Sequence, residues 1–284
     1  IFRNHLSLIE DMFIQFDSSK FFNGNPTERL LCLNLGAEFI QASKDTEMKF
    51  MDLSRKMKAA YEISYPSGQL TDMETNQAQF YLAIRSIIYK QTKGNAPDTE
   101  VMNKVVEKMV YDAITSTGVE DIVNKGTDEL FGEEFQKQVD EIDMPISKFN
   151  ALLKLLRKAI SKYGENNKVK AIEFSERLKK VVESYNNRDS QVFVSEVVYD
   201  FINSLSDELL EILKALQEDK ISFEKMGISY EEKAFYDILI KVRDDNDFIY
   251  EDSKCLILAK AIKELVDDKS QYADWASRDD IKNQ

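Results

Sequence analysis

The chain has 284 residues and a formal net charge of −13, from 51 Asp and Glu against 38 Lys and Arg. Hydrophobic residues form 43% of the sequence, which is ample for a core, whereas 9 Gly and 4 Pro are too few for a sheet protein with many tight turns. The acidic balance by itself disfavours a DNA-binding domain. We therefore predict an all-α protein, a multi-helix bundle of antiparallel amphipathic helices.

Four helices are predicted in the first part of the chain. Capping residues at one end and Gly or Pro near the other place them at about 25–40, 45–64, 72–93 and 98–118. Asn25, Pro26 and Glu28 supply an N-cap, a proline at the first helical position and a capping partner. Asp72 and Thr75 are alternative caps of the third helix. Helical spacing marks apolar stripes at Leu30, Leu33, Ala37, Ile40, Phe80, Ile84, Ile87, Val101, Val105 and Met109.

A looser stretch from Val119 to Asp143 separates these helices from the next group. It is the candidate boundary between an N-terminal helical subdomain, 1–125, and a C-terminal one, 126–284; a single domain is the alternative. Beyond it, helices are predicted over 145–164, 169–184 and 192–226.

The clearest signals for the end of one helix and the start of the next follow residue 226. Gly227 can take the left-handed conformation that stops a helix, with Ile228 packing back on Phe223 as in a Schellman motif. Ser229 and Glu232 then form a capping box. Spacing predicts an apolar face at Phe235, Leu239 and Val242, and a polar face at Lys233, Asp237 and Lys241.

The two cysteines, Cys32 and Cys255, lie in apolar helical runs and are expected to be buried free thiols, with a disulfide as the alternative. No stretch approaches the roughly 18 uninterrupted apolar residues of a membrane span, and no signal peptide is visible. These features predict a cytoplasmic protein.

Side chains for catalysis are scarce. His5 is the only histidine, no His/Cys cluster has metal-ligand spacing, and the sequence has no glycine-rich phosphate loop. Asp45, Glu47 and Lys49 have the D-x-E-x-K spacing of metal-dependent nucleases, but in a helix positions two apart point in different directions. Acidic residues are also favoured at a helix start by the helix dipole. We interpret these residues as a helix start and predict no catalytic, cofactor-binding or metal-ligating residue.

A basic segment runs from Pro145 to Arg188. It contains eleven Lys and Arg against four Glu, so the segment is net +7 and the remainder of the chain net −20. Such a segment can contact DNA phosphate or an acidic patch of a partner; the alternative is an ordinary solvated face that pairs with the chain's own acidic helices. The candidate contact residues are Arg157, Lys158, Lys162, Lys168, Lys170, Arg177, Lys179 and Lys180.

Trp275 is the only tryptophan and lies in a polar stretch near the end of the sequence. Trp is enriched in protein interfaces, so Trp275 is a candidate interface anchor. Packing against neighbouring helices is the alternative.

The amino-acid sequences of several segments resemble those of a known family. EEKAFYDIL (231–239), LAKAIKELVDDKSQYADW (258–275) and SRDDIK (277–282) resemble the C-terminal helical region of the R subunit, the motor and endonuclease subunit, of type I restriction enzymes. FNGNPTERLLCLNL (22–35) and YNNR (185–188) resemble earlier parts of the same region, so the resemblance covers nearly the whole chain.

The resemblance implies a non-catalytic assembly and coupling module. Such a module would dock the ATP-dependent DNA translocase and endonuclease onto the methyltransferase core, formed by the methyltransferase (M) and specificity (S) subunits. It also implies that the motor and nuclease domains, which use ATP and Mg²⁺, precede Ile1. Because the family pattern continues beyond Gln284, we expect the chain to be a fragment of that subunit. The alternative function is a sequence-independent contact of the segment 145–188 with the backbone of duplex DNA.

Overall fold

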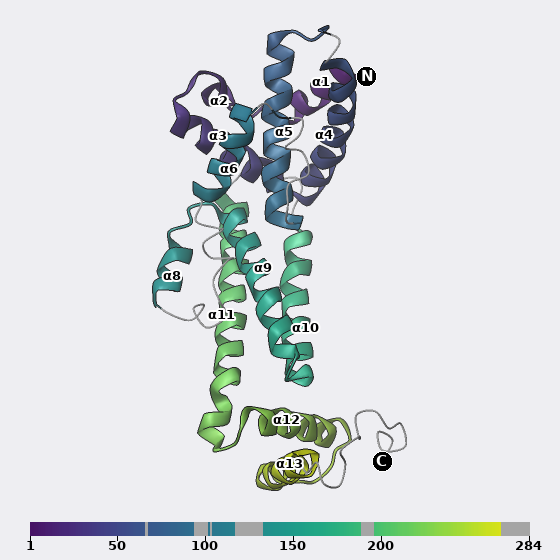
Figure 1. The fold of residues 1–284 in the computed structure, drawn as a ribbon, viewed down its shortest axis with the longest axis vertical. Coiled ribbons are helices and arrows are strands. Elements are labelled where there is room, and N and C mark those ends of the chain that lie inside the picture. Colours follow the sequence, from purple (N-terminus) through teal and green to yellow (C-terminus); the bar gives the residue numbers. More distant parts are fainter. Residues whose placement is uncertain (66–67, 94–101, 103, 117–132, 189–195, 268–284) are drawn as a thin grey trace. The chain divides into compact units, whose positions relative to one another are not determined.

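The computed structural model describes residues 1–65, 68–93, 102, 104–116, 133–188 and 196–267 (Figure 1). Within these ranges every regular element is a helix, which confirms the predicted all-α class. The helices before residue 141 are α1 (Phe2–Met12), α2 (Ser19–Asn23), α3 (Pro26–Gln41), α4 (Lys44–Ser64), α5 (Asp72–Lys93), α6 (Lys104–Ser116) and α8 (Glu133–Asp140). The later ones are α9 (Pro145–Gly164), α10 (Lys168–Asn186), α11 (Glu196–Met226), α12 (Tyr230–Asp245) and α13 (Asp252–Asp267).

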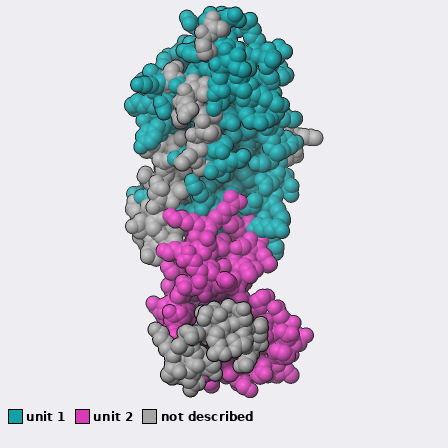
Figure 2. All heavy atoms as spheres, turned by 45° about the vertical axis from the view of Figure 1, so that its right-hand side comes forward, with its two compact units in different colours: residues 1–156, 179–211 teal, residues 157–178, 212–284 magenta. Residues whose placement is uncertain are grey.

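The chain divides into two compact units (Figure 2). Unit 1 contains residues 1–156 and 179–211, and unit 2 contains residues 157–178 and 212–284. The predicted boundary between residues 125 and 126 falls in the range 117–132, which lies outside the described residues.

Unit 1 is built around an aromatic core. In it α1 packs on α4, α4 on α5, and α3 on both α5 and α6 (Figure 1). Gly36 lets α3 approach α5 closely, because a Cβ atom there would lie 2.6 Å from Cδ1 of Ile84. The ring of Phe13 lies at the centre, with centroid distances of 5.0 to 5.9 Å to Phe16, Phe39, Phe50, Phe80 and Tyr81.

Local capping residues account for the starts of α3, α4 and α5 in unit 1. The Asn25–Glu28 capping box is present at α3, and Ser43 caps α4 through the backbone N–H of Thr46. The cap of α5 was predicted wrongly. Thr71, rather than Asp72 or Thr75, accepts a hydrogen bond from the backbone of Glu74, because the Glu74 carboxylate can accept one in return from the N–H of Thr71 at 2.8 Å.

The stripe predicted for the fourth helix was wrong at Val105, whereas Met109 packs against the core as predicted. Val105 is 63% exposed, whereas Val106 and Val110 face the core. The helix begins at Lys104, and the predicted start at Asp98 lies outside the described residues, as does Val101. Which face of this helix is buried is decided by its packing against α3 and α5.

The start of α9 at Pro145, as predicted, has a tertiary cause as well as a local one. Glu38 of α3 is buried and accepts hydrogen bonds from the backbone N–H groups of Ile146 and Ser147, at 3.0 and 2.8 Å. These donors have no partner inside the helix, so the carboxylate caps α9 from another helix. Burial raises the pKa of Glu38, and the hydrogen bonds from Ser147 and Ile146 oppose that shift.

In unit 2 the turn between α11 and α12 has the predicted geometry. Gly227 has φ of +64°, the N–H of Ile228 donates to the carbonyl of Phe223 at 3.2 Å, and Ser229 and Glu232 form a capping box. This is the hydrogen-bond pattern of a Schellman stop. Helix α12 then packs on α13, whose Cys255 and Ala259 are buried. Both Cys32 and Cys255 are buried free thiols.

Candidate functional site

Most of the predicted contact residues are at the surface. Lys170 is the exception, because it is half-buried and forms an ion pair with Glu173 at 2.8 Å. Burial alone would lower the pKa of Lys170, but the Glu173, Asp219 and Asp237 carboxylates together raise it above its ordinary value. The exposed ones are Arg157, Lys158, Lys162, Lys168, Arg177, Lys179 and Lys180.

The C-terminal half of α9 collects the strongest positive charge. The helix has no acidic residue from Pro145 to Gly164, and Arg157, Lys158 and Lys162 lie at spacings of one, four and five residues along its exposed side. Arg157 and Lys158 form no ion pair with any described side chain. On α10, by contrast, Lys170 pairs with Glu173 and Lys179 with Glu183.

Arg188, counted among the basic residues of the segment, has a structural role. Its side chain is 1% exposed and donates to the carbonyl of Gln41 at 3.0 and 2.7 Å and to Glu47 at 3.2 Å. The guanidinium also lies 3.9 Å from the centroid of the Tyr185 ring. The pairing of this base with the chain's own acidic residue corrects its assignment to a basic surface.

The D-x-E-x-K residues belong to the first turns of α4, as predicted. Glu47 faces inward to Arg188 and also pairs with Lys44. Lys49 instead lines a surface hollow of about 390 Å³ together with Asp11 and Phe39. The two residues therefore point to different places, and the sequence match is a helix start.

Three further expectations concern an interface anchor, metal binding and membrane spanning. Trp275 lies outside the described residues, so its role as an interface anchor stays a prediction. Among the described residues, no three His, Cys, Asp or Glu side chains are placed to share a metal ion. None of the described helices has the length and apolar character needed to cross a bilayer.

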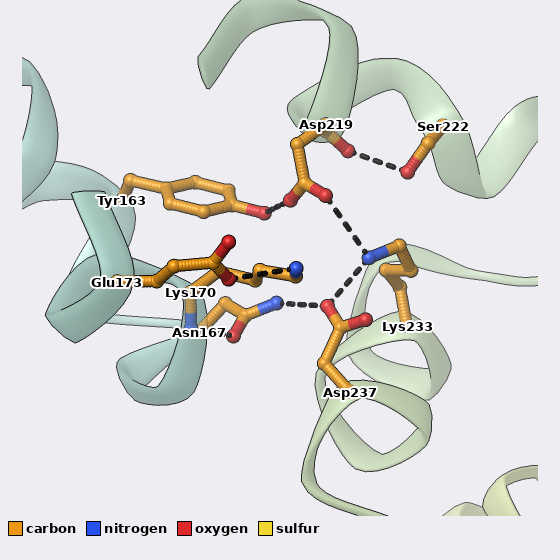
Figure 3. A network of polar contacts seen from close by, with 8 residues as sticks. All are labelled: Tyr163, Asn167, Lys170, Glu173, Asp219, Ser222, Lys233 and Asp237. Carbon is orange, nitrogen blue, oxygen red and sulfur yellow. Dashed lines mark hydrogen bonds and ion pairs between the residues drawn. The ribbon is translucent and has the colours of Figure 1, made fainter. Parts of the chain in front are cut away.

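A buried polar network in unit 2 was missed by the sequence analysis (Figure 3). Lys233 and Asp237 were predicted on the outer face of α12, but they are 4% and 6% exposed, whereas Val242 of the predicted apolar face is 46% exposed. The Lys233 ammonium donates to Asp237 at 2.5 Å and to Asp219 of α11 at 3.4 Å. The face was misjudged because charged residues four apart on a helix usually form a surface pair.

The network continues into the turn between α9 and α10. The Tyr163 hydroxyl donates to Asp219. The side-chain amide of Asn167 donates to Asp237 at 2.6 Å, and its Oδ1 accepts a hydrogen bond from the backbone N–H of Lys170. Burial, and then the hydrogen bond to Asp219, raise the pKa of Tyr163, so the phenol stays protonated. These groups form hydrogen bonds and ion pairs with one another (Figure 3), and the network joins the turn, α11 and α12 of unit 2.

The outer surfaces of α12 and α13 carry large apolar side chains. On α13, Ile257, Leu258 and Leu265 are 67%, 39% and 56% exposed, while Cys255 and Ala259 of the same helix are buried. In the loop between the helices, Ile249 is fully exposed at 101%. Contiguous exposed apolar residues mark interaction sites in many proteins.

The sequence as a whole matches one protein family. Residues 1–284 match the family described as "Type I restriction enzyme HindI endonuclease subunit-like, C-terminal". The chain belongs to this family. The match covers every residue and confirms the resemblance inferred from the segments quoted above.

Two curated relatives agree with this assignment. One, from Methanocaldococcus jannaschii, is assigned as the endonuclease subunit of type I restriction enzyme MjaIXP and is 22% identical over 244 residues, 84% of this chain and 22% of the relative. The other, the type I restriction enzyme HindI endonuclease subunit of Haemophilus influenzae, is 25% identical over 252 residues, with the same two shares. The chain thus spans about a fifth of the length of these relatives. No solved structure gives a significant match.

Proposed function

We propose that the chain docks a type I restriction endonuclease subunit onto its methyltransferase core, made of methyltransferase and specificity subunits, and couples that core to the translocase and nuclease. The proposal rests on membership of the endonuclease-subunit family and on one structural observation, the exposed apolar side of α13. In this proposal ATP and Mg²⁺ serve the motor and nuclease parts of the subunit, and the complex acts in the cytoplasm.

Helix α13 is apolar on two sides. Cys255 and Ala259 are buried on one side, within unit 2 where α13 packs on α12. Leu258 and Leu265 lie seven residues apart on another side and are exposed. An apolar stripe at this spacing is the pattern by which helices bind grooves of partner proteins.

The docking proposal predicts a loss of binding when this stripe becomes polar. The double change Leu258→Ser and Leu265→Ser should weaken binding of the 284-residue chain to the purified methyltransferase core at least roughly tenfold, because hot-spot side chains contribute about 2 kcal/mol or more. Surface plasmon resonance measures the affinity, and circular dichroism checks that the helices remain.

The matched control is the double change Leu31→Ser and Leu35→Ser on α3 of unit 1, where the leucines are 46% and 45% exposed. This variant should bind as the unchanged chain does. Equal losses in both variants would reject α13 as the docking surface, and absence of binding by the unchanged chain would reject the docking function itself.

A second candidate function is contact with the phosphate backbone of duplex DNA. The observation that favours it is the acid-free helix α9, with Arg157 and Lys158 exposed and without an ion pair among the described side chains. Such a surface would bind duplex without reading its sequence, since phosphate contacts position a protein and carry no base information.

DNA binding would show itself in its salt dependence. The affinity for a labelled duplex should fall steeply with salt, and Lys158→Glu or Lys179→Glu should weaken it and lower the slope of log K against log salt by about one per lost contact. Lys56→Glu, an equal charge change on α4 of unit 1, should weaken binding less. Fluorescence anisotropy at several salt concentrations measures the affinity. No detectable binding at low salt would reject the DNA-binding function.

A further inference from the structure

The loop between α12 and α13 has an unusual composition. From the last two residues of α12 to the first residue of α13, residues 244–252 read DDNDFIYED, so three consecutive large apolar residues are flanked on both sides by acidic ones. Phe248 and Tyr250 are half exposed, and Ile249 exposes its whole side chain. A loop exposed to water alone is usually polar, so the apolar centre needs a separate explanation.

The backbone of this loop is held in one shape. After α12 ends, the N–H of Phe248 donates to the carbonyl of Arg243 at 3.0 Å, and the N–H of Tyr250 donates to the carbonyl of Phe248 at 3.2 Å. Asp247 takes a left-handed conformation with φ of +54°, which Asp tolerates better than most residues. Together these features turn the chain sharply so that Ile249 stands at its tip.

Side chains brace the same loop from both helices. The Arg243 guanidinium donates to the carbonyl of Tyr250 at 3.1 Å and to Asp252 at 2.5 Å. The Lys254 ammonium lies 5.0 Å from the centroid of the Tyr250 ring, and the rings of Tyr250 and Phe248 meet edge to face at 6.1 Å. The two rings are thus oriented before any partner arrives, which lowers the entropy lost on binding.

The charges around the tip are not balanced within the loop. Arg243 pairs with Asp244 and Asp252, and Lys241 pairs with Asp245. Asp247 and Glu251, which directly flank Phe248–Tyr250, form no ion pair with any side chain that the structure describes. The apolar tip is therefore bracketed by two carboxylates whose charge is available to a partner.

We propose that this loop is a preformed recognition tip, residues 247–251, that inserts Ile249 into an apolar pocket rimmed by Lys or Arg on a protein subunit of the methyltransferase core. The apolar centre supplies affinity, and the flanking carboxylates select a positively charged rim and speed association. The inference rests on the docking function proposed above and names the chemistry of the partner's surface.

The test compares variants of the 284-residue chain for binding to the purified methyltransferase core. Ile249→Ser should weaken binding roughly tenfold or more, mainly through faster dissociation. Its matched control is Ile63→Ser on α4 of unit 1, where the side chain is 80% exposed, and this variant should bind normally. Neither substitution removes a buried side chain, so both variants are expected to fold.

The charge requirement is tested by the double change Asp247→Asn and Glu251→Gln. Asn tolerates the left-handed backbone at position 247, so the two charges are removed with little strain. This variant should associate several times more slowly and show a weaker dependence on salt. Unchanged association and salt dependence would overturn the basic rim of the pocket.

The remaining outcomes separate the two proposals. If the unchanged chain does not bind the methyltransferase core, the docking function fails. If it binds and Ile249→Ser binds equally well, docking stands and the recognition tip fails. Dimerisation of the chain alone that Ile249→Ser abolishes, measured by analytical ultracentrifugation, would assign the pocket to a second copy and overturn the proposal.

Discussion

Replacing Arg188 with Met is expected to lower the free energy of unfolding of unit 1 by about 3–5 kcal/mol. The change removes the donors to the Gln41 carbonyl, at 3.0 and 2.7 Å, and the partner of the buried Glu47 carboxylate. Methionine fills much of the same volume, so the loss reports the missing hydrogen bonds and charge rather than a cavity. Urea denaturation followed by circular dichroism measures it.

The matched control is Arg55→Met on α4. Arg55 also pairs with a carboxylate, Asp52 at 2.8 Å, but its side chain is 67% exposed. Exposed ion pairs contribute about 0–1 kcal/mol, so this variant should unfold almost as the unchanged chain does. Similar losses in the two variants would show that burial of Arg188 has no special effect.

Replacing Lys233 with Met is expected to destabilise unit 2 to a similar extent, by about 3–5 kcal/mol. The Lys233 ammonium pairs with Asp237 and Asp219, whose side chains are only 5% and 20% exposed. Its removal leaves two carboxylates without their cation where little water reaches them. Lys241→Met on the same helix is the control, because Lys241 pairs with Asp245 at 3.1 Å with its side chain 52% exposed. Thermal and urea unfolding of both variants measure the difference.

A double change separates charge from packing in this network. If the loss in Lys233→Met comes from uncompensated carboxylates, then adding Asp237→Leu should restore part of the stability, since a buried ion pair can often be replaced by apolar residues. A double variant less stable than Lys233→Met would instead assign the loss to the hydrogen bonds with Asn167.

Structural features with local sequence signals were predicted correctly. The capping box of Asn25 and Glu28, the range 145–164 and the Gly227 stop were all predicted and observed. The capping box and the Gly227 stop each depend on residues within about five positions of one another, whereas the start of α9 also uses the Glu38 carboxylate of α3. The cap of α5 failed because the capping partner of Thr71 was overlooked, not because the signal was absent.

The roles of Arg188, Lys233 and Asp237 could not be found in this way. A lysine and an aspartate four residues apart look the same in sequence whether a helix exposes them or buries them. Their burial depends on Asp219 and Asn167, which lie 14 or more residues away along the chain. Likewise the partners of Arg188, Gln41 and Glu47, lie more than 140 residues before it.

The sequence by itself determined the helical class, most helix boundaries and the family. The first two follow from local patterns, and the family follows from sequence similarity along the whole chain. Only the tertiary structure decided which faces are buried, which bases stay at the surface and which loop presents its apolar residues to solvent. The physical reason is that exposure is a property of the packing partners, and α12 carries apolar side chains on more than one side. Ile249 is therefore an ordinary apolar residue in the sequence and a fully exposed one in the structure.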